Sequence, residues 1–243
     1  VAYTLTTLRL QTSFDTHAKR LHLIVCLIVV QAAFGAWTVT WKLHPMAVMP
    51  HLIGGMSITT LLYSTYLLNQ PHTPQALPNR VLFNLYLCVL TIGIQIVLGG
   101  WTSANYAQLI CPDFPTCQGQ WVPSLNFTSA FHIPPIGPNY EGGLMSTIAR
   151  TTIHYSHRIG ALFSSLCFIS LAVHCFIIRR SLTRNFTKQL TICLVLFSCQ
   201  ILLGIANIVL ALPLTIAVMH NVGALLLLLA CIQLINMSTT DNA

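Results

Sequence analysis

Charged residues are scarce in this sequence of 243 residues: only four are Asp or Glu, and all charged types together make up 6%. Soluble domains carry about 25% charged residues, so this composition excludes a protein whose whole surface faces water. Hydrophobic residues reach 55%, and the mean hydropathy is +0.73. The sequence therefore predicts an integral membrane protein.

The shortage of acidic residues leaves a net charge of +7, which by itself could suggest nucleic-acid binding. The basic residues, however, stand in short loops between apolar runs, a pattern that is typical of membrane topology. Nucleic acid is therefore not an expected partner of this chain.

Six apolar runs have the length of roughly 20 residues that crossing the hydrocarbon layer requires. They cover residues 21–41, 46–68, 81–101, 147–178, 189–211 and 214–237. The predicted fold class is all-α integral membrane, with six transmembrane helices.

Basic residues mark one side of the membrane. The N-terminal segment, the loop 69–80 and the loop 179–188 hold Arg9, Lys19, Arg20, Arg80, Arg179, Arg180, Arg184 and Lys188. The loops on the other side hold Lys42 alone. The positive-inside rule then predicts that both termini are cytoplasmic and that the long loop 102–146 is exported.

Nine cysteines are present, and seven of them lie in apolar runs, where they are predicted to be small buried hydrophobes. Cys111 and Cys117 lie instead in the exported loop, where a disulfide can form. A metal site is the weaker interpretation, because the spacing is C-x5-C and no second pair exists.

Three of the histidines inside apolar runs have a glycine three residues later: His51, His157 and His220. A histidine in lipid is costly, so it indicates function by default. The alternative is that each one hydrogen-bonds to a neighbouring helix and that the glycines permit close packing. Three copies favour a repeated ligand position, with each glycine expected to make room for a flat macrocycle. From the run boundaries, all three lie roughly 9 to 15 Å below the outer boundary.

A second motif, Gln-x3-Gly, recurs near the outer ends of spans one, three and five as Gln31-x3-Gly35, Gln95-x3-Gly99 and Gln200-x3-Gly204. Spans one and two therefore resemble spans five and six, as expected for an internal duplication. The repeat predicts one complete four-helix bundle, in 81–243 with the exterior loop 102–146, and half of a second pseudo-symmetric bundle in 1–68. Residues 69–80 are the expected cytoplasmic Pro-rich linker. By the same logic, two spans, one with a partner for His51, are expected before residue 1.

Two neutral imidazoles on different helices of a bundle can ligate one heme iron, and His157 and His220 form that pair in the complete bundle. Zinc is the alternative metal, but it needs further ligands, and the spans contain no Asp or Glu. His154 is interpreted in two ways. It either lies beside the iron ligands, where it supports them or carries protons, or it donates a hydrogen bond that packs helices together. Arg158 is interpreted as the partner of a heme propionate or of backbone carbonyls on a neighbouring helix. Other histidines, such as His44, are predicted to be structural or solvated.

Several specific motifs resemble the bacterial type of the heme A synthase family over nearly the whole chain. They are Gly99-Gly-Trp-Thr-Ser-Ala-Asn-Tyr106, Cys111-Pro-Asp-Phe-Pro-Thr-Cys117-Gln-Gly-Gln-Trp121, Ile136-Gly-Pro-Asn-Tyr-Glu-Gly-Gly143, Ile153-His-Tyr-Ser-His-Arg158, Gln200-Ile-Leu-Leu-Gly204 and Val218-Met-His-Asn221. The resemblance implies eight spans in two pseudo-symmetric bundles. It also implies oxidation of a methyl group of heme O to the formyl group of heme A, for terminal oxidases.

The resemblance also implies roles for single residues. His157 and His220 match the pair that ligates a bound heme b, and His51 matches a catalytic-bundle histidine where heme O reacts. Cys111 and Cys117 match an exterior cysteine pair. The chain departs from the family because it lacks the Glu-x-x-His-Arg motif of the second span. Its C-terminal counterpart here is His154-x-x-His157-Arg158.

The leading hypothesis is thus a heme-dependent oxidoreductase in the bacterial inner membrane. A b-type heme protein that only carries electrons or binds heme is the second hypothesis, and a small-solute transporter is the third. Heme O and the lipid bilayer are the expected partners. Heme O synthase, a membrane electron acceptor and a second copy of the chain are further candidates.

Overall fold

A computed structural model describes residues 2–71 and 74–238, and for 2–17 the backbone alone. The described chain is helical and confirms the predicted fold class. Its helices are α1 (Ala2–Thr40), α2 (Pro45–Leu68), α3 (Asn79–Ala104), α4 (Phe127–Ala130), α5 (Thr147–Ile177), a 3₁₀ turn (Arg179–Ser181), α6 (Arg184–Val209) and α7 (Leu214–Ser238).

Within the described residues, six helices are long and apolar enough to cross a membrane, as predicted. Most bounds agree with the predicted spans to within a few residues. The helix α6 begins earlier than the apolar run because Thr183 caps it: the Thr183 hydroxyl accepts a hydrogen bond from Phe186 N at 3.3 Å. The short α4, capped by Asn126, lies in the exterior loop and was not predicted.

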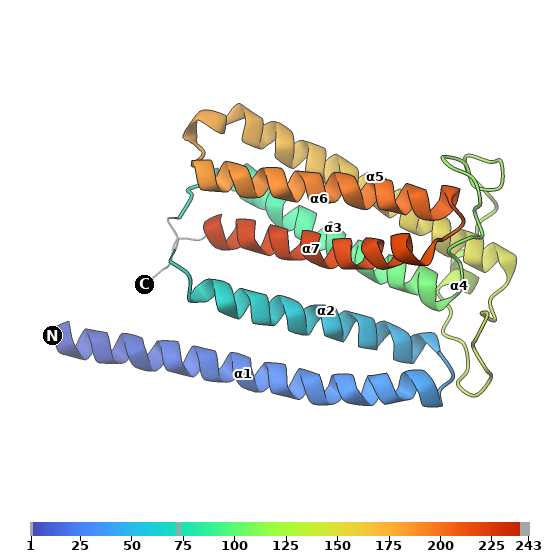
Figure 1. The fold of residues 1–243 in the computed structure, drawn as a ribbon, viewed down its shortest axis with the longest axis horizontal. Helices are drawn as coiled ribbons and strands as arrows, with labels where there is room; N and C mark the ends of the chain where they lie inside the picture. The colour runs from blue at the N-terminus through green and yellow to red at the C-terminus, as the bar shows by residue number, and fades with distance from the viewer. Residues whose placement is uncertain (1, 72–73, 239–243) are drawn as a thin grey trace.

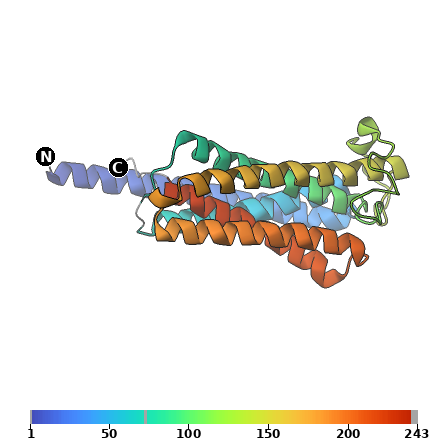
Figure 2. The same ribbon diagram turned by 90° about the horizontal axis from the view of Figure 1, so that it is seen from above.

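Four helices, α3, α5, α6 and α7, form one bundle, and α2 lies against its α3 and α7 (Figure 1). The helix α1 packs on α2. Where α2 crosses α3, a Cβ at Gly100 would lie 2.6 Å from the Leu52 side chain and 2.8 Å from the Met49 sulfur, so the two helices approach closely. The start of α1 and the end of α7 lie at the end opposite the exterior loop, in both views (Figures 1 and 2).

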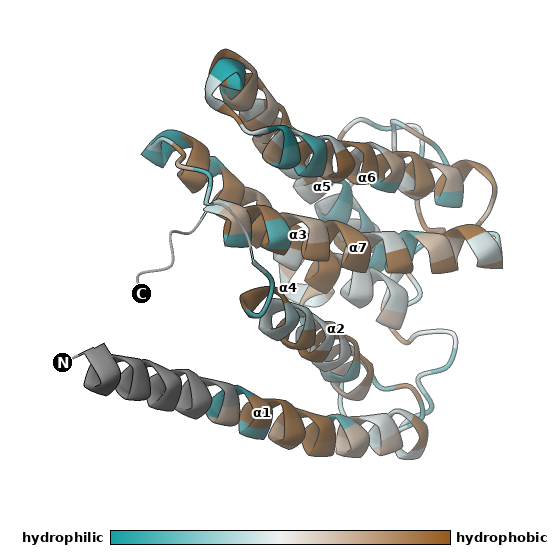
Figure 3. Cartoon of the chain, turned by 60° about the vertical axis from the view of Figure 1, so that its left-hand side comes forward, coloured by the Kyte–Doolittle hydropathy of each residue, from teal (hydrophilic) through white to brown (hydrophobic). Residues whose placement is uncertain are grey.

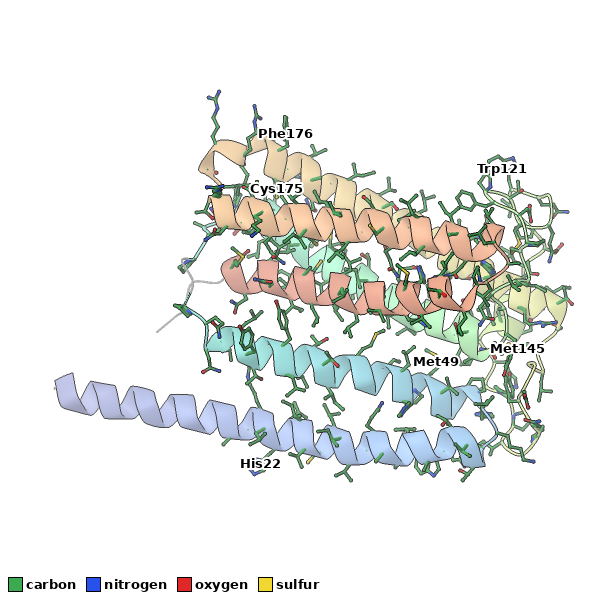
Figure 4. The ribbon with its side chains drawn as sticks, in the orientation of Figure 1. His22, Met49, Trp121, Met145, Cys175 and Phe176 are labelled. Carbon is green, nitrogen blue, oxygen red and sulfur yellow. A yellow bond between two sulfur atoms is a disulfide. The ribbon has the colours of Figure 1, made fainter. Side chains whose placement is uncertain are left out.

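The bundle is solid at one end. A hydrophobic core of leucines, phenylalanines and cysteines fills the half away from the exterior loop, including Leu85, Phe168, Leu171, Phe186 and Leu234. Phe168 and Phe197 stack there with ring centroids 4.0 Å apart. Cys175, at the same end in Figure 4, is buried in this core. Hydrophobic residues predominate along the long helices (Figure 3), and large apolar side chains such as Val39, Phe83 and Leu202 are exposed, so this surface suits lipid.

The exterior loop holds the α1–α2 turn. Tyr140 is fully buried, its hydroxyl donates to Asn105 Oδ1 at 3.0 Å, and its backbone N donates to Lys42 O at 3.0 Å. His44, also buried, contacts the Tyr140 ring and makes a 3.1 Å hydrogen bond to Pro134 O, so its predicted structural role is confirmed. The loop therefore joins the α1–α2 pair to the bundle.

At the opposite end, Gln75 ties the Pro-rich segment to two other parts of the chain. Its backbone N donates to Met237 O at 2.7 Å, and its side-chain nitrogen donates to Ser181 O at 3.2 Å. Its side-chain oxygen accepts from Thr183 N at 2.7 Å. The described part of this segment is thus an anchored connection between α2 and α3.

We expect Gln75→Ala to lower the free energy of unfolding by about 1–3 kcal/mol, because it removes three side-chain hydrogen bonds of a buried amide. Thermal unfolding of the detergent-solubilised protein measures this effect. Gln120→Ala is the control, since its exposed side chain bonds to no other described residue. An equal loss of stability in both variants would contradict the anchoring role of Gln75.

Candidate functional site

A cavity of about 670 Å³ occupies the half of the bundle next to the exterior loop. Its size falls in the usual range for ligand sites, about 300–1,000 Å³. Side chains of α3, α5, α6 and α7 form most of its lining, and α2 adds Leu52 and Met56. The lining is mainly apolar, with a few polar groups that include His157 of α5 and His220 of α7. The structure therefore brings the predicted pair of ligands into one cavity.

Each of these two histidines lies against a glycine of the helix that pairs with its own. A Cβ at Gly99 of α3 would lie 3.2 Å from Cε1 of His157, and a Cβ at Gly204 of α6 would lie 3.2 Å from Cε1 of His220. Both glycines line the cavity. The glycine of each Gln-x3-Gly motif therefore makes room for the imidazole of the paired helix.

The glutamine of the same motif bonds to the backbone of that histidine. Gln200 Nε2 donates to His220 O at 2.7 Å. Gln95, in the amide orientation that satisfies its neighbours, donates from Nε2 to His157 O at 3.1 Å. In each pair, the first helix thus contributes a glutamine amide to the contact, and the second contributes a histidine.

The glycine three residues after each histidine has a different role from the one predicted. A Cβ at Gly54, Gly160 or Gly223 would run into the glutamine side chain of the paired helix. The expectation that these glycines make room for a macrocycle is therefore wrong. They permit close helix packing, as the alternative interpretation held.

His51 lies apart from the cavity. It has the same surroundings as the other two: its ring lies against Gly35, where a Cβ would be 2.9 Å away, and Gln31 Nε2 donates to His51 O. The His51 Nδ1 group donates to Gln31 O at 3.2 Å, a tautomer that leaves Nε2 as a potential ligand atom. However, the residue is exposed on the α1–α2 pair. Of the three predicted histidines, His157 and His220 therefore share the cavity, and His51 lies outside it.

Arg158 reaches out of the cavity lining to the exterior loop. Its two terminal nitrogens donate to Thr116 O at 2.6 Å and to Cys111 O at 2.8 Å. Arg158 therefore bonds to backbone carbonyls, but these belong to the exterior loop and not to a neighbouring helix; pairing with a heme propionate stays a prediction. Cys111 and Cys117 form a disulfide. Arg158 therefore binds the exterior loop at the short segment that the disulfide closes.

His154 is a packing donor. It is buried, and its Nδ1 donates to Ala107 O at 2.8 Å, which ties α5 to the start of the exterior loop. It also lines the cavity, as do Phe114 and Trp121 of the loop. Trp121 lies at the loop end of the molecule in Figure 4. The exterior loop thus forms part of the cavity wall.

Several buried polar atoms of the described side chains have no hydrogen-bond partner, and almost all of them belong to cavity-lining residues. They are Arg158 Nε, Ser164 Oγ, Gln200 Oε1, Asn207 Oδ1 and His220 Nδ1, with Arg150 Nε outside the cavity. Buried polar groups are normally paired, so this concentration marks a place for a ligand. Sequence reasoning missed Ser164 and Asn207, which belong to no repeat. It recognised the glutamines only as repeat markers.

Among the described side chains, which are those of residues 18–71 and 74–238, no three His, Cys, Asp or Glu converge as metal ligands. The cavity is lined by the imidazoles of His154, His157 and His220 in a mainly apolar setting, and His154 already bonds to Ala107 O. A family model described as cytochrome oxidase assembly protein, COX15-CtaA, matches residues 1–232. The chain belongs to this family.

The chain is also similar to curated members of the family. A heme A synthase of Shewanella oneidensis is 43% identical over 218 residues, which are 87% of this chain and 64% of that protein. A heme A synthase of Azorhizobium caulinodans is 28% identical, covering 83% of this chain and 56% of that protein. One of Halalkalibacterium halodurans is 25% identical, covering 82% and 60%. The chain thus spans less than two thirds of the length of these relatives.

Within the loop, Asp113 organises the turn that the disulfide closes. The Thr116 hydroxyl and the backbone N–H groups of Gly119 and Gln118 donate to its carboxylate. These bonds lower the pKa of Asp113 to about 2 from the ordinary 3.8. The carboxylate therefore stabilises the loop above about pH 4, and this contribution is lost as the pH falls toward 2.

We expect Asp113→Asn to loosen this turn and to speed reduction of the Cys111–Cys117 disulfide by a phosphine. The ratio of the variant rate to the wild-type rate should exceed one at about pH 6 and should approach one only below about pH 2, where most of the wild-type carboxyl is also protonated. Using the ratio cancels the pH dependence of the phosphine itself. A ratio of one throughout would show that the carboxylate does not order the loop.

Proposed function

We propose that this family member is a heme A synthase, which oxidises a methyl group of heme O to the formyl group of heme A for terminal oxidase assembly. One observation carries the proposal: the cavity brings His157 and His220 together in a chain that belongs to the cytochrome oxidase assembly family. The curated relatives described above are named heme A synthase.

The cavity fits heme b as the cofactor. His157 and His220, on separate helices, would hold the heme iron, and the apolar lining would suit the faces of a macrocycle. The unpartnered Arg158 Nε and Asn207 Oδ1 add polar groups to the lining. When bound, a heme supplies an iron that gains and loses single electrons. The protein's part is to hold the ligands, to exclude water with the apolar lining, and to close one side with the Arg158-anchored loop.

His51 is the proposed catalytic residue at a second site on the α1–α2 pair, where heme O would react. It has the same glycine and glutamine contacts as the two cavity histidines and keeps a tautomer suited to ligation. Residues 1–68 are thus proposed as part of a substrate bundle, and 81–243 as the heme b bundle.

A b-type heme protein without catalytic activity is the second candidate. The exposure of His51, outside the cavity that holds His157 and His220, favours it. Both proposals place the chain in the inner membrane with cytoplasmic termini and an exported loop. Heme O synthase, a membrane electron acceptor and a second copy of the chain remain proposed partners.

Replacing either His157 or His220 with Ala should remove the low-spin heme b signal, because each variant leaves the iron with one imidazole. His51→Ala should leave that signal intact and serves as the matched control. Reduced-minus-oxidised spectra of the purified variants, with the heme extracted and identified, make the measurement. An equal loss in all three variants would contradict the assignment of heme b to the cavity.

Activity separates the two candidates. We expect cells that make heme O and express this chain to accumulate heme A, and the His51→Ala variant to abolish that product while keeping heme b. Extraction and chromatography of total heme measure both. A chain that binds heme b and yields no heme A would support the electron-carrier alternative.

A further inference from the structure

The cavity is closed on most of its sides. At its inner end lies the hydrophobic core, and Phe197 of that core lines the cavity. At its outer end lies the exterior loop, whose backbone Arg158 binds. The closely packed α3–α5 and α6–α7 pairs form two walls. Between α3 and α7, the helix α2 packs on both and adds Leu52 and Met56 to the lining.

The remaining side lies between α5 and α6. These helices approach each other at few places, and none of the described helices packs on both of them as α2 packs on α3 and α7. Toward the inner end, Phe168 of α5 stacks on Phe197 of α6 with ring centroids 4.0 Å apart. Toward the outer end, the Tyr155 hydroxyl of α5 donates to Trp121 O at 3.0 Å. At a rise of about 1.5 Å per residue, about 20 Å of α5 separates these two contacts.

Four aliphatic side chains lie along this stretch and also line the cavity. They are Ile159 and Leu162 on α5 and Ile201 and Ile205 on α6. At about 100° per residue, Leu162 is turned about 140° from His157, whose ring lies against α3, so Leu162 belongs to the edge of the lining away from α3. Although they line the cavity, Ile159 and Leu162 are 47% and 59% exposed. The cavity therefore reaches the outer surface of the bundle along this edge, which we call the lateral opening.

The lateral opening lies at the depth of the lipid. Its four residues belong to α5 and α6, two of the helices that are long and apolar enough to cross a membrane. A ligand that passes between them therefore comes from hydrocarbon and not from water. The chemistry of this edge suits an apolar, flat ligand that partitions into the bilayer, because such a ligand keeps its faces out of water throughout the passage.

We propose that the cavity takes up and releases its heme sideways, from the lipid, through the lateral opening between α5 and α6. The inference rests on the proposed heme b site and adds to it the route by which the ligand reaches His157 and His220. The competing route leads through the exterior loop, whose Phe114 and Trp121 also line the cavity.

A residue at an entrance and a residue that holds the ligand change different quantities. Added bulk at an entrance slows uptake and release by the same factor, because it raises the barrier and leaves the affinity unchanged. A residue that contacts the bound ligand changes the affinity itself. Leu166 is the matched control for Leu162, because it lies one turn later on α5, is 57% exposed and is not among the residues that line the cavity.

The test compares Leu162→Trp, Leu162→Ala and Leu166→Trp with the wild type, all as full chains in lipid vesicles. Absorbance follows the uptake of ferric heme b from loaded vesicles and its release to apomyoglobin. We expect Leu162→Trp to slow both rates by about fivefold or more, because bulk must be displaced at each passage. Leu162→Ala should speed both rates, and Leu166→Trp should match the wild type. Reducing the Cys111–Cys117 disulfide with a phosphine should leave both wild-type rates unchanged.

The outcomes separate this inference from the function on which it rests. If the wild type binds no heme b, the proposed site itself fails. If it binds heme b and both Leu162 variants exchange it at wild-type rates, only the lateral route is overturned, and faster exchange after disulfide reduction would assign the route to the exterior loop. A change in release alone, with altered affinity, would also overturn it. Should Leu162→Trp fail to fold, the two rates of Ile205→Trp decide, with Leu202→Trp as the control, since Leu202 is exposed on α6 and is not among the lining residues.

Discussion

A histidine inside a membrane must be held by its neighbours, and here a glutamine and a glycine of the paired helix do so. The amide bonds to the histidine backbone, and the glycine lets the ring lie against the other helix. Because lipid supplies no hydrogen bonds, a polar contact of this kind also joins the helices. The arrangement of the bundle and the position of its candidate ligands thus depend on the same few residues.

The two halves of the bundle, along its length, are packed differently. The half away from the exterior loop is filled by large apolar side chains and stacked rings. The other half is hollow and holds nearly all the buried unpartnered polar atoms of the described side chains. A cavity costs stability, so the solid half and the disulfide-closed loop compensate for the hollow one. Arg158 connects the hollow half to the exterior loop, because it lines the cavity and bonds to the loop backbone.

Much of the fold and of the candidate site could be predicted from the sequence. Apolar runs of membrane length fix the six spans, and a histidine repeated in one local setting indicated that His157 and His220 share a site. The role of Gly160 and Gly223 could not be read in this way, because their neighbours are glutamines of another helix. The partners of Arg158 depend on how the loop folds around its disulfide, which no periodicity records.

The α1–α2 pair shows which features the repeated motif provides by itself. Its glutamine, glycine and histidine make the same contacts as those of the bundle, yet its histidine is exposed and lines no shared cavity. The glutamine–glycine–histidine contact of one helix pair therefore orients the histidine, but one such pair does not by itself form a ligand cavity. What distinguishes His157 and His220 is that two such pairs face each other across one hollow. The proposed ligation by two histidines then depends on how helix pairs assemble, and His51 would need a second pair opposite it to bind heme in the same manner.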